Sequence, residues 1–383
     1  MNLADLPDAA IAPLAATDDL LTAVRAVAQG PLAQRVEAID RQGHYPADIL
    51  RQLGALGAMS AHLEAPAGRA DFFLAIEAMA EISRVCGATG FMMWCQAVCG
   101  LYMQQSGNPA LLGEALQRHA LGERLGGTAL SNPMKSYAQI ESLLLKATPV
   151  DGGYLVNGSL PWVSNLGEGH SCGAIAAVMD GDGAAGRELM FMLRCGAAGV
   201  ELRECPSFSA MEGTGTYAIR LTDYFVGAAD LIADPAKPYI ARIRGAFVML
   251  QCGMAFGVTQ GAIDSMWDVE AQLGHVNQFL EDRPDGLQAE LDALTDRVRQ
   301  LALTPFERST DFFIDVLDAR AHGAELCLRA AQSALMHQGA RGYLMSSAVQ
   351  RRVRESHFVA IVTPAIKHLR KEMARLSAGE TPS

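Results

Sequence analysis

The sequence lacks most of the short motifs from which a function is usually inferred. No GxGxxG lies between a predicted strand and a helix, and no GxxxxGK[ST] is present, which argues against the usual dinucleotide and P-loop sites. There is no HExxH and no GxSxG nucleophile elbow. No two of the eight cysteines are at CxxC spacing, which excludes a zinc ribbon and a thioredoxin-like motif. We therefore expect no metal site.

Positive charge is also scarce. The net charge is −11 and the pI is about 5.3, whereas a nucleic-acid binder carries a basic surface. Half of the residues are hydrophobic and 19% are charged, which excludes disorder for most of the chain. The N-terminal residues are acidic and lack the basic start of a secretory signal, and the cysteines lie among apolar residues as free thiols do. We expect a cytoplasmic protein.

Two long stretches contain no charged residue, one between Arg84 and Glu114 and one between Arg244 and Asp264. A membrane span requires about twenty predominantly apolar residues. Both stretches instead include glycine, glutamine and other polar residues. We interpret both as helices buried inside a soluble bundle, and we expect no membrane partner.

The chain predicts an α+β fold in three parts: a helical domain over 1–125, a β domain over 126–235 and a helical bundle over 236–383. In the middle part, Asn157-Gly158 lies between two apolar runs and predicts a hairpin turn, because both residues tolerate positive φ. In the last part, apolar residues recur at helical spacing in four long segments, which favours a four-helix bundle. These segments are 239–273, 286–303, 310–339 and 347–376.

Several segments, in this order, resemble the acyl-CoA dehydrogenase family of flavoproteins. Thr128-Ala-Leu-Ser-Asn-Pro133 and Pro161-Trp-Val-Ser-Asn165 are similar to the two flavin-contacting segments of that family. Gly339-Ala-Arg-Gly-Tyr343 resembles its late glycine-rich turn. The resemblance implies a helical N-terminal domain, a middle β-barrel and a C-terminal four-helix bundle. It also implies FAD, with FMN as the alternative, and a homo-oligomer, either a dimer or a tetramer.

The resemblance assigns candidate cofactor contacts to five residues. Trp162 supplies a flat apolar wall, and Ser164 supplies a hydroxyl at flavin N5. Leu130 and Ser131 supply backbone and hydroxyl contacts at the pyrimidine edge, and Gly339 lies in the turn that meets a neighbouring subunit's FAD. The alternatives are that Trp162 is a core residue of the barrel and that the two serines form local turn hydrogen bonds.

The chain departs from the family where the substrate reacts. The family glutamate that removes the α-proton corresponds to Thr363, and a threonine hydroxyl is too weak a base. On an earlier helix, Phe247 replaces the glutamate of some members and Val248 replaces an arginine near the substrate. We expect Phe247, Val248 and Thr363 to line the substrate pocket and leave the catalytic residue unassigned.

A displaced base would have to come from elsewhere in the chain. Glu355, Glu270 and Asp268 are candidates, although each is more simply a solvated helix charge. The sequence therefore predicts a flavin-dependent oxidoreductase acting on an acyl thioester, such as an acyl-CoA, or on a related small molecule. Two alternatives stay open. One is a two-component flavin-dependent monooxygenase or desulfinase-like enzyme on the same fold, and the other is a non-catalytic flavin-binding protein.

Overall fold

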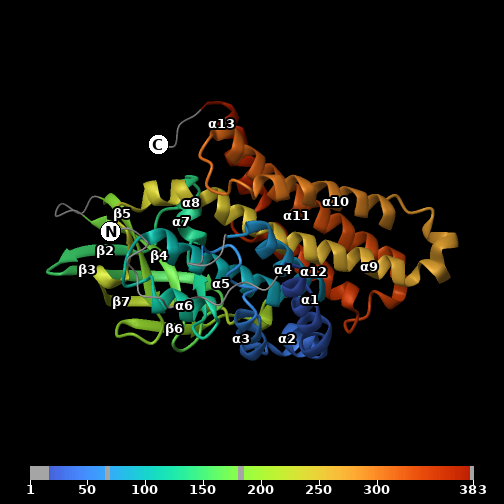
Figure 1. Cartoon of the computed structure of the whole chain (residues 1–383), viewed down its shortest axis with the longest axis horizontal. Helices are drawn as coiled ribbons and strands as arrows, with labels where there is room; N and C mark the ends of the chain where they lie inside the picture. Colours follow the sequence, from blue (N-terminus) through green and yellow to red (C-terminus); the bar gives the residue numbers. More distant parts are fainter. Residues whose placement is uncertain (1–16, 65–69, 180–184, 380–383) are drawn as a thin grey trace.

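The computed structural model describes residues 17–64, 70–179 and 185–379. The first residues of the chain, on which the cytoplasmic expectation rests, lie outside these ranges. Helices come first, then a sheet, then a second set of helices. Figure 1 places the strands at one end of the molecule, while the long helices of the C-terminal part extend side by side toward the other end. The predicted α+β class is confirmed.

The N-terminal helices pack around one almost fully buried helix. The first long uncharged stretch forms α5 (Gly87–Ser106), in which every residue from 87 to 103 is buried. The helix before it, α4 (Phe72–Val85), has Asp71 as its N-cap. The Asp71 carboxylate accepts a hydrogen bond from the Leu74 amide at 2.8 Å. The other helices here are α1 (Thr17–Val27), η2 (Ala28–Leu32), η3 (Ala33–Arg35), α2 (Val36–Gln42), α3 (Ala47–Ala55) and α6 (Glu114–Ala120).

The middle part is a mixed eight-stranded sheet with its own hydrophobic core. The strand order is β6-β7-β3-β2-β4-β5-β8, and β1 pairs with β4 in parallel. A short helix, α7 (Ser131–Tyr137), connects β1 to β2. The strands are β1 (Gly126–Thr128), β2 (Lys146–Val150), β3 (Gly153–Val163), β4 (Ser171–Met179), β5 (Ala185–Arg194), β6 (Val200–Glu204), β7 (Tyr217–Gly227) and β8 (Leu231–Ala233), with 3-10 turns at η4 (Glu212–Thr214) and η5 (Ala228–Asp230).

The predicted hairpin turn at Asn157-Gly158 is wrong, because both residues lie inside β3. The turn that joins β2 to β3 is Asp151-Gly152, where Gly152 has a φ of 75°. At Asn157 the pairing of β3 with β7 shifts register. The Asn157 side chain bridges this bulge by accepting from the Asp223 amide and donating to the Asp223 carboxylate, both at 2.9 Å. The same dipeptide thus serves a bulge rather than a turn.

The C-terminal helices include the second uncharged stretch. Within the described residues, Ala236–Asn277 is long and apolar enough to cross a membrane, but 94% of its most apolar window is buried inside the protein, as in a core helix. It is divided at Gln251 into α8 (Ala236–Leu250) and α9 (Cys252–Asn277). The remaining helices are α10 (Pro284–Leu301), α11 (Thr310–Gln338), η6 (Gly339–Arg341), α12 (Ala348–Ile361) and α13 (Ile366–Ser377).

The last predicted segment, 347–376, is two helices rather than one. The chain leaves α12 after Ile361 and enters α13 at Ile366. Pro364 has no amide hydrogen, and its ring disfavours helical geometry at Thr363, so the helix ends there. The break matters for function because it turns Thr363 out of a helix and into the wall of the main cavity.

Candidate active site

The main cavity has a volume of about 500 Å³ and lies where the sheet meets α5, α8 and α12. This size is in the range of small-molecule and cofactor sites. One side is lined by hydroxyl groups and the other by aromatic rings. Its lining includes Phe91, Trp94, Cys95, Thr128, Ser131, Lys135, Trp162, Ser164, Thr214, Thr216, Phe247, Arg354, His357, Phe358 and Thr363.

The end of β3 forms the hydroxyl-rich side. Trp162 is 61% exposed and has a φ of 55°, so the predicted alternative of a core position does not hold. Positive φ is rare for a bulky side chain and marks a position that the surrounding structure enforces. The Ser164 hydroxyl lies 2.6 Å from the Thr216 hydroxyl, which lies 2.8 Å from the Thr214 hydroxyl. Ser164 thus makes a local hydrogen bond and also lines the cavity.

Four aromatic rings form the opposite side. Phe91 stacks on Trp94 with a centroid distance of 5.7 Å and meets Phe358 edge to face at 4.6 Å. Phe247 lies edge to face on Trp94 at 5.2 Å, and its carbonyl accepts a hydrogen bond from the indole nitrogen at 3.4 Å. These rings come from α5, α8 and α12, and such pairs fix one another's orientation. The aromatic side is therefore a rigid wall.

Thr363 lies between the two sides. Its hydroxyl is 2.9 Å from the Ser131 hydroxyl at the start of α7, and its carbonyl accepts a hydrogen bond from the Gln251 side chain at 2.9 Å. Both predicted residues, Ser131 and Thr363, therefore meet in one cavity, together with Trp162, Ser164 and Phe247.

No aspartate or glutamate is among the described residues that line the main cavity. The ionisable lining groups are Lys135, Arg354, His357 and the thiol of Cys95. Burial raises the pKa of the Cys95 thiol well above its ordinary value, so it is neutral and a poor nucleophile. Arg354 pairs with the Asp40 carboxylate through two hydrogen bonds of 2.8 and 2.5 Å, which raise the pKa of the guanidinium.

Three predicted site residues lie outside the main cavity. Leu130 is 1% exposed and packs its side chain in the core at the start of α7. Val248 faces a second, smaller cavity. Gly339 ends α11 and lines neither cavity within this chain, so its contact with a neighbouring subunit's cofactor stays a prediction.

The three acidic candidates for a displaced base also line neither cavity. Glu355 is buried, accepts a hydrogen bond from the Gly87 amide at 3.0 Å and lies 3.3 Å from Arg351. Burial raises the pKa of its carboxyl. Glu270 pairs with Arg283, and Asp268 is exposed on α9. Glu355 and Glu270 are therefore held in structural contacts, and Asp268 is a solvated surface charge.

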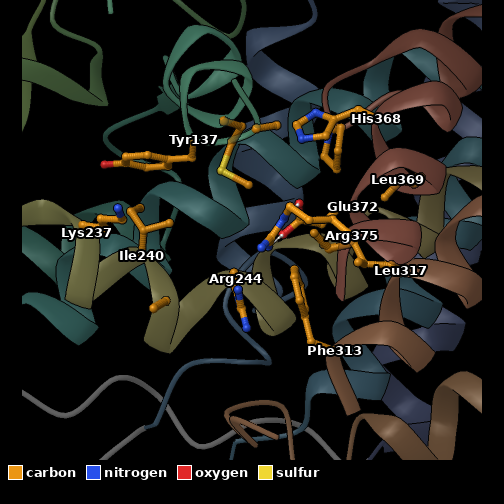
Figure 2. Close-up of a pocket in the computed structure, with 15 residues that line it drawn as sticks. Tyr137, Lys237, Ile240, Arg244, Phe313, Leu317, His368, Leu369, Glu372 and Arg375 are labelled. Atoms are coloured by element: carbon orange, nitrogen blue, oxygen red, sulfur yellow. Dashed lines mark hydrogen bonds and ion pairs between the residues drawn. The ribbon is translucent and has the colours of Figure 1, made fainter. Parts of the chain in front are cut away.

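The second cavity has a volume of about 120 Å³ and lies on the other side of α7, α8 and the Thr363-Pro364 turn. Figure 2 shows Lys237 and Arg244 on α8 and Arg375 and Glu372 on α13 around it. Arg375 binds Glu372 through hydrogen bonds of 3.0 and 2.6 Å. Arg244 lies 4.0 Å above the Phe313 ring. Most of the lining is apolar, and its charged side chains are mainly cationic.

The sequence missed part of the site. Phe91 and Phe358 carry no local signal, since they are apolar residues on helices, and Arg354 and His357 look like solvated helix charges. Thr214 ends η4 and Thr216 directly precedes β7, and nothing in the sequence marks either hydroxyl as part of the site. Among the described residues, no group of three or more histidine, cysteine or acidic side chains could hold a metal ion.

Comparisons with known proteins agree with this architecture. Residues 15–123 match the family described as acyl-CoA dehydrogenase, N-terminal domain. The short-chain specific acyl-CoA dehydrogenase of Clostridium acetobutylicum is 22% identical over 355 residues, which cover 88% of this chain and 91% of that protein. Butyryl-CoA dehydrogenase from Megasphaera elsdenii has a similar structure, with a TM-score of 0.83 and 19% identity over 99% of this chain and 100% of that one. The FAD complex of PigA has a TM-score of 0.77 and 13% identity, covering 94% and 97% of the two chains.

Proposed function

Because the chain belongs to the acyl-CoA dehydrogenase family, we propose that it is a flavin-dependent oxidoreductase whose cofactor lies in the main cavity. The observation that carries the proposal is that the exposed indole of Trp162 lines the same cavity as the paired hydroxyls of Ser131 and Thr363. FAD is the expected cofactor, and FMN is the alternative.

The residues of the cavity fit such a cofactor. A flavin needs a flat apolar surface on its ring and polar groups at the edge that gains charge on reduction. Trp162 offers the flat surface, and the hydroxyls of Ser164 and Ser131 offer the polar edge. When bound, a flavin supplies hydride transfer at N5. The chain itself binds and orients the ring, and its aromatic wall excludes water from the opposite side.

An acyl thioester is the substrate class that the surroundings favour. The second cavity shares α7, α8 and the Thr363-Pro364 turn with the main cavity, and it presents Lys237, Arg244 and Arg375. Cationic side chains suit the phosphate groups of a thioester carrier such as coenzyme A. The aromatic wall suits an apolar acyl group. We propose a substrate whose anionic end lies on α8 and α13 and whose reacting end faces Thr363.

One observation favours a second candidate function. Removal of an α-proton requires a base of suitable strength within hydrogen-bond reach, and the described lining of the main cavity contains no carboxylate. A two-component flavin-dependent monooxygenase or a desulfinase-like enzyme on this fold would not need that base. In such an enzyme, Ser131 and Thr363 would orient the substrate by hydrogen bonds.

Anaerobic spectroscopy of the purified protein separates these functions. Bleaching of a bound flavin by a panel of acyl-CoA thioesters would support the dehydrogenase. No bleaching, together with tight binding of flavin reduced by a separate reductase and consumption of O₂ with substrate, would favour the second candidate. A protein that binds neither oxidised nor reduced flavin would refute both and leave a chain without flavin chemistry.

A pair of variants tests the location of the cofactor. The double variant Trp162→Ala with Ser164→Ala should weaken flavin binding by about tenfold or more, because it removes the flat surface and one hydroxyl. Trp267→Ala is the matched control, since Trp267 is 49% exposed on α9 and lines neither cavity. Titration of the apoprotein with flavin gives both affinities. Full flavin affinity in the double variant would mean that the cofactor lies elsewhere.

A further inference from the structure

A fully buried arginine lies behind the Thr363 turn and has no ionic partner in the part of the chain that the structure describes. Arg320, on α11, is 0% exposed, and no carboxylate lies within ion-pair distance of it among the described residues. Its Nη1 atom has no hydrogen-bond partner there. Burial lowers the pKa of this guanidinium. A buried charge that is not paired costs several kcal/mol, and an apolar side chain of similar volume is often at least as stable. The stability of the core therefore does not explain why an arginine occupies this position.

The contacts of Arg320 point toward the main cavity. Its Nε donates to the Gln251 side-chain oxygen at 3.0 Å, and its Nη2 donates to the Val359 carbonyl at 2.6 Å. Val359 is in the last turn of α12, where backbone carbonyls lack helical partners and the helix dipole is negative. The guanidinium thus caps the end of α12, immediately before the turn that contains Thr363.

Gln251 extends this contact to the turn itself. It is fully buried at the break between α8 and α9, and its Nε2 donates to the Thr363 carbonyl at 2.9 Å. One guanidinium therefore holds the segment from Val359 to Thr363 at both ends, directly at Val359 and through Gln251 at Thr363. Ile361, Val362 and Thr363 of this segment line the main cavity, as does Phe358 immediately before it, whereas Arg320 and Gln251 do not.

We propose that Arg320 and Gln251 are positioning residues that fix the Thr363 turn and thereby set the hydroxyl pair of Thr363 and Ser131 against the bound flavin. The proposal rests on the proposed function for the flavin, but the fixed turn belongs to the protein alone. If the Gln251 link is lost, the Thr363 carbonyl is released, and the hydroxyl 2.9 Å from Ser131 no longer has a fixed direction.

Gln251→Glu separates this role from fold stability. The carboxylate can still accept from Arg320, and it gives the buried guanidinium an ionic partner, but it cannot donate to the Thr363 carbonyl. Gln251→Leu removes both contacts, and Arg320→Met removes the charge. Gln260→Leu is the matched control, because Gln260 is on α9, which begins immediately after Gln251, and bonds to Gln288 and Asp264 away from the cavity.

Two measurements on the full-length protein test the proposal. The first is hydrogen–deuterium exchange of the peptide that contains residues 358–366, without flavin. We expect Gln251→Glu to exchange several-fold faster than wild type at the Val362 amide, which donates to the Phe358 carbonyl, while the urea midpoint stays at least as high. The Gln260→Leu control should exchange as wild type does in this peptide.

The second measurement is flavin binding, followed by fluorescence and by visible circular dichroism of the bound ring. We expect Gln251→Glu to bind FAD about tenfold more weakly, the equivalent of one lost hydrogen bond, with an altered dichroism spectrum. Wild-type exchange in Gln251→Glu and Gln251→Leu would overturn the proposal whether or not flavin binds. Faster exchange with unchanged flavin affinity and spectrum would also overturn it, since the turn would then not affect the cofactor. If wild type binds no flavin, the proposed function fails, and with it the assignment to the cofactor.

Discussion

Acid should destabilise the packing around α5, because two neutral histidines are buried against this helix. His62 donates through Nε2 to the Ala97 carbonyl at 2.9 Å, and His119 donates through Nε2 to the Gln96 carbonyl at 2.8 Å. Burial lowers the pKa of each histidine to about 4. The Gln96 side chain donates to the other ring nitrogen of His119 and accepts from the Gly126 amide at 2.7 Å, which connects α5 to β1.

The size of the effect follows from proton linkage. The unfolded chain binds a proton at each histidine near pH 6.5, whereas the folded chain does so only near pH 4. The contribution of each neutral histidine to the free energy of unfolding is therefore complete above the pKa of the unfolded state. It is lost as the pH falls toward the pKa of the folded state. Between pH 7 and pH 5, each histidine should lower the free energy of unfolding by about 2 kcal/mol. Two such losses are large beside the ~5–15 kcal/mol that stabilises a typical protein.

Urea unfolding of wild type and His119→Gln at both pH values measures this loss. Glutamine can still donate to the Gln96 carbonyl but takes up no proton, so about half of the loss attributed to the two histidines should disappear. Exposed His44 supplies the control, and His44→Gln should keep the wild-type loss. Hydrogen exchange at the Gly126 amide should accelerate at pH 5 in wild type. If His119→Gln loses as much stability as wild type between pH 7 and pH 5, the reasoning about His119 is refuted.

Two further substitutions probe ion pairs. Asp40→Asn should lower the free energy of unfolding by about 3 kcal/mol, since it leaves the largely buried Arg354 guanidinium without its carboxylate partner. A loss below about 1 kcal/mol in urea unfolding would contradict this, because exposed ion pairs contribute no more than that. Asp234→Asn should cost only about 1 kcal/mol at neutral pH, because the Arg187 partner is 42% exposed. The hydrogen bond from Arg187 lowers the pKa of the Asp234 carboxyl. The difference in free energy of unfolding between wild type and Asp234→Asn should therefore persist above about pH 4 and become smaller as the pH falls below it.

The order of the domains could be predicted because each part has its own local pattern. Helical spacing, strand-like runs and the return of helical spacing survive without tertiary information. The hairpin could not be placed in the same way, since Asp151-Gly152 and Asn157-Gly158 both supply a glycine that tolerates positive φ. Only the pairing of β3 with β7 decides between a turn and a bulge.

In the candidate site, too, the residues in continuous sequence segments could be predicted, whereas those brought together by helix packing could not. Trp162 and Ser164 belong to a continuous segment that resembles a known motif, and the structure places both in the main cavity. The aromatic wall joins Phe91 to Phe358, which are far apart in the sequence and come together only when α5 packs against α12. The break after Ile361 had a local signal in Pro364. That signal was outweighed by the helical pattern on either side of it.

The charges around the main cavity limit the chemistry that it can perform. Arg354 is neutralised by Asp40 and Lys135 lies 3.5 Å from Glu141, so neither cation is unpaired. Of the described lining residues, His357 alone carries an imidazole. The hydroxyl pair at Thr363 uses one of its two hydrogens internally, which leaves one to donate to a ligand. Such a site can orient a substrate by hydrogen bonds, and no carboxylate lies among the described residues that line it. We therefore keep the base-independent reaction as the second proposal, and anaerobic bleaching by acyl-CoA thioesters decides between the two.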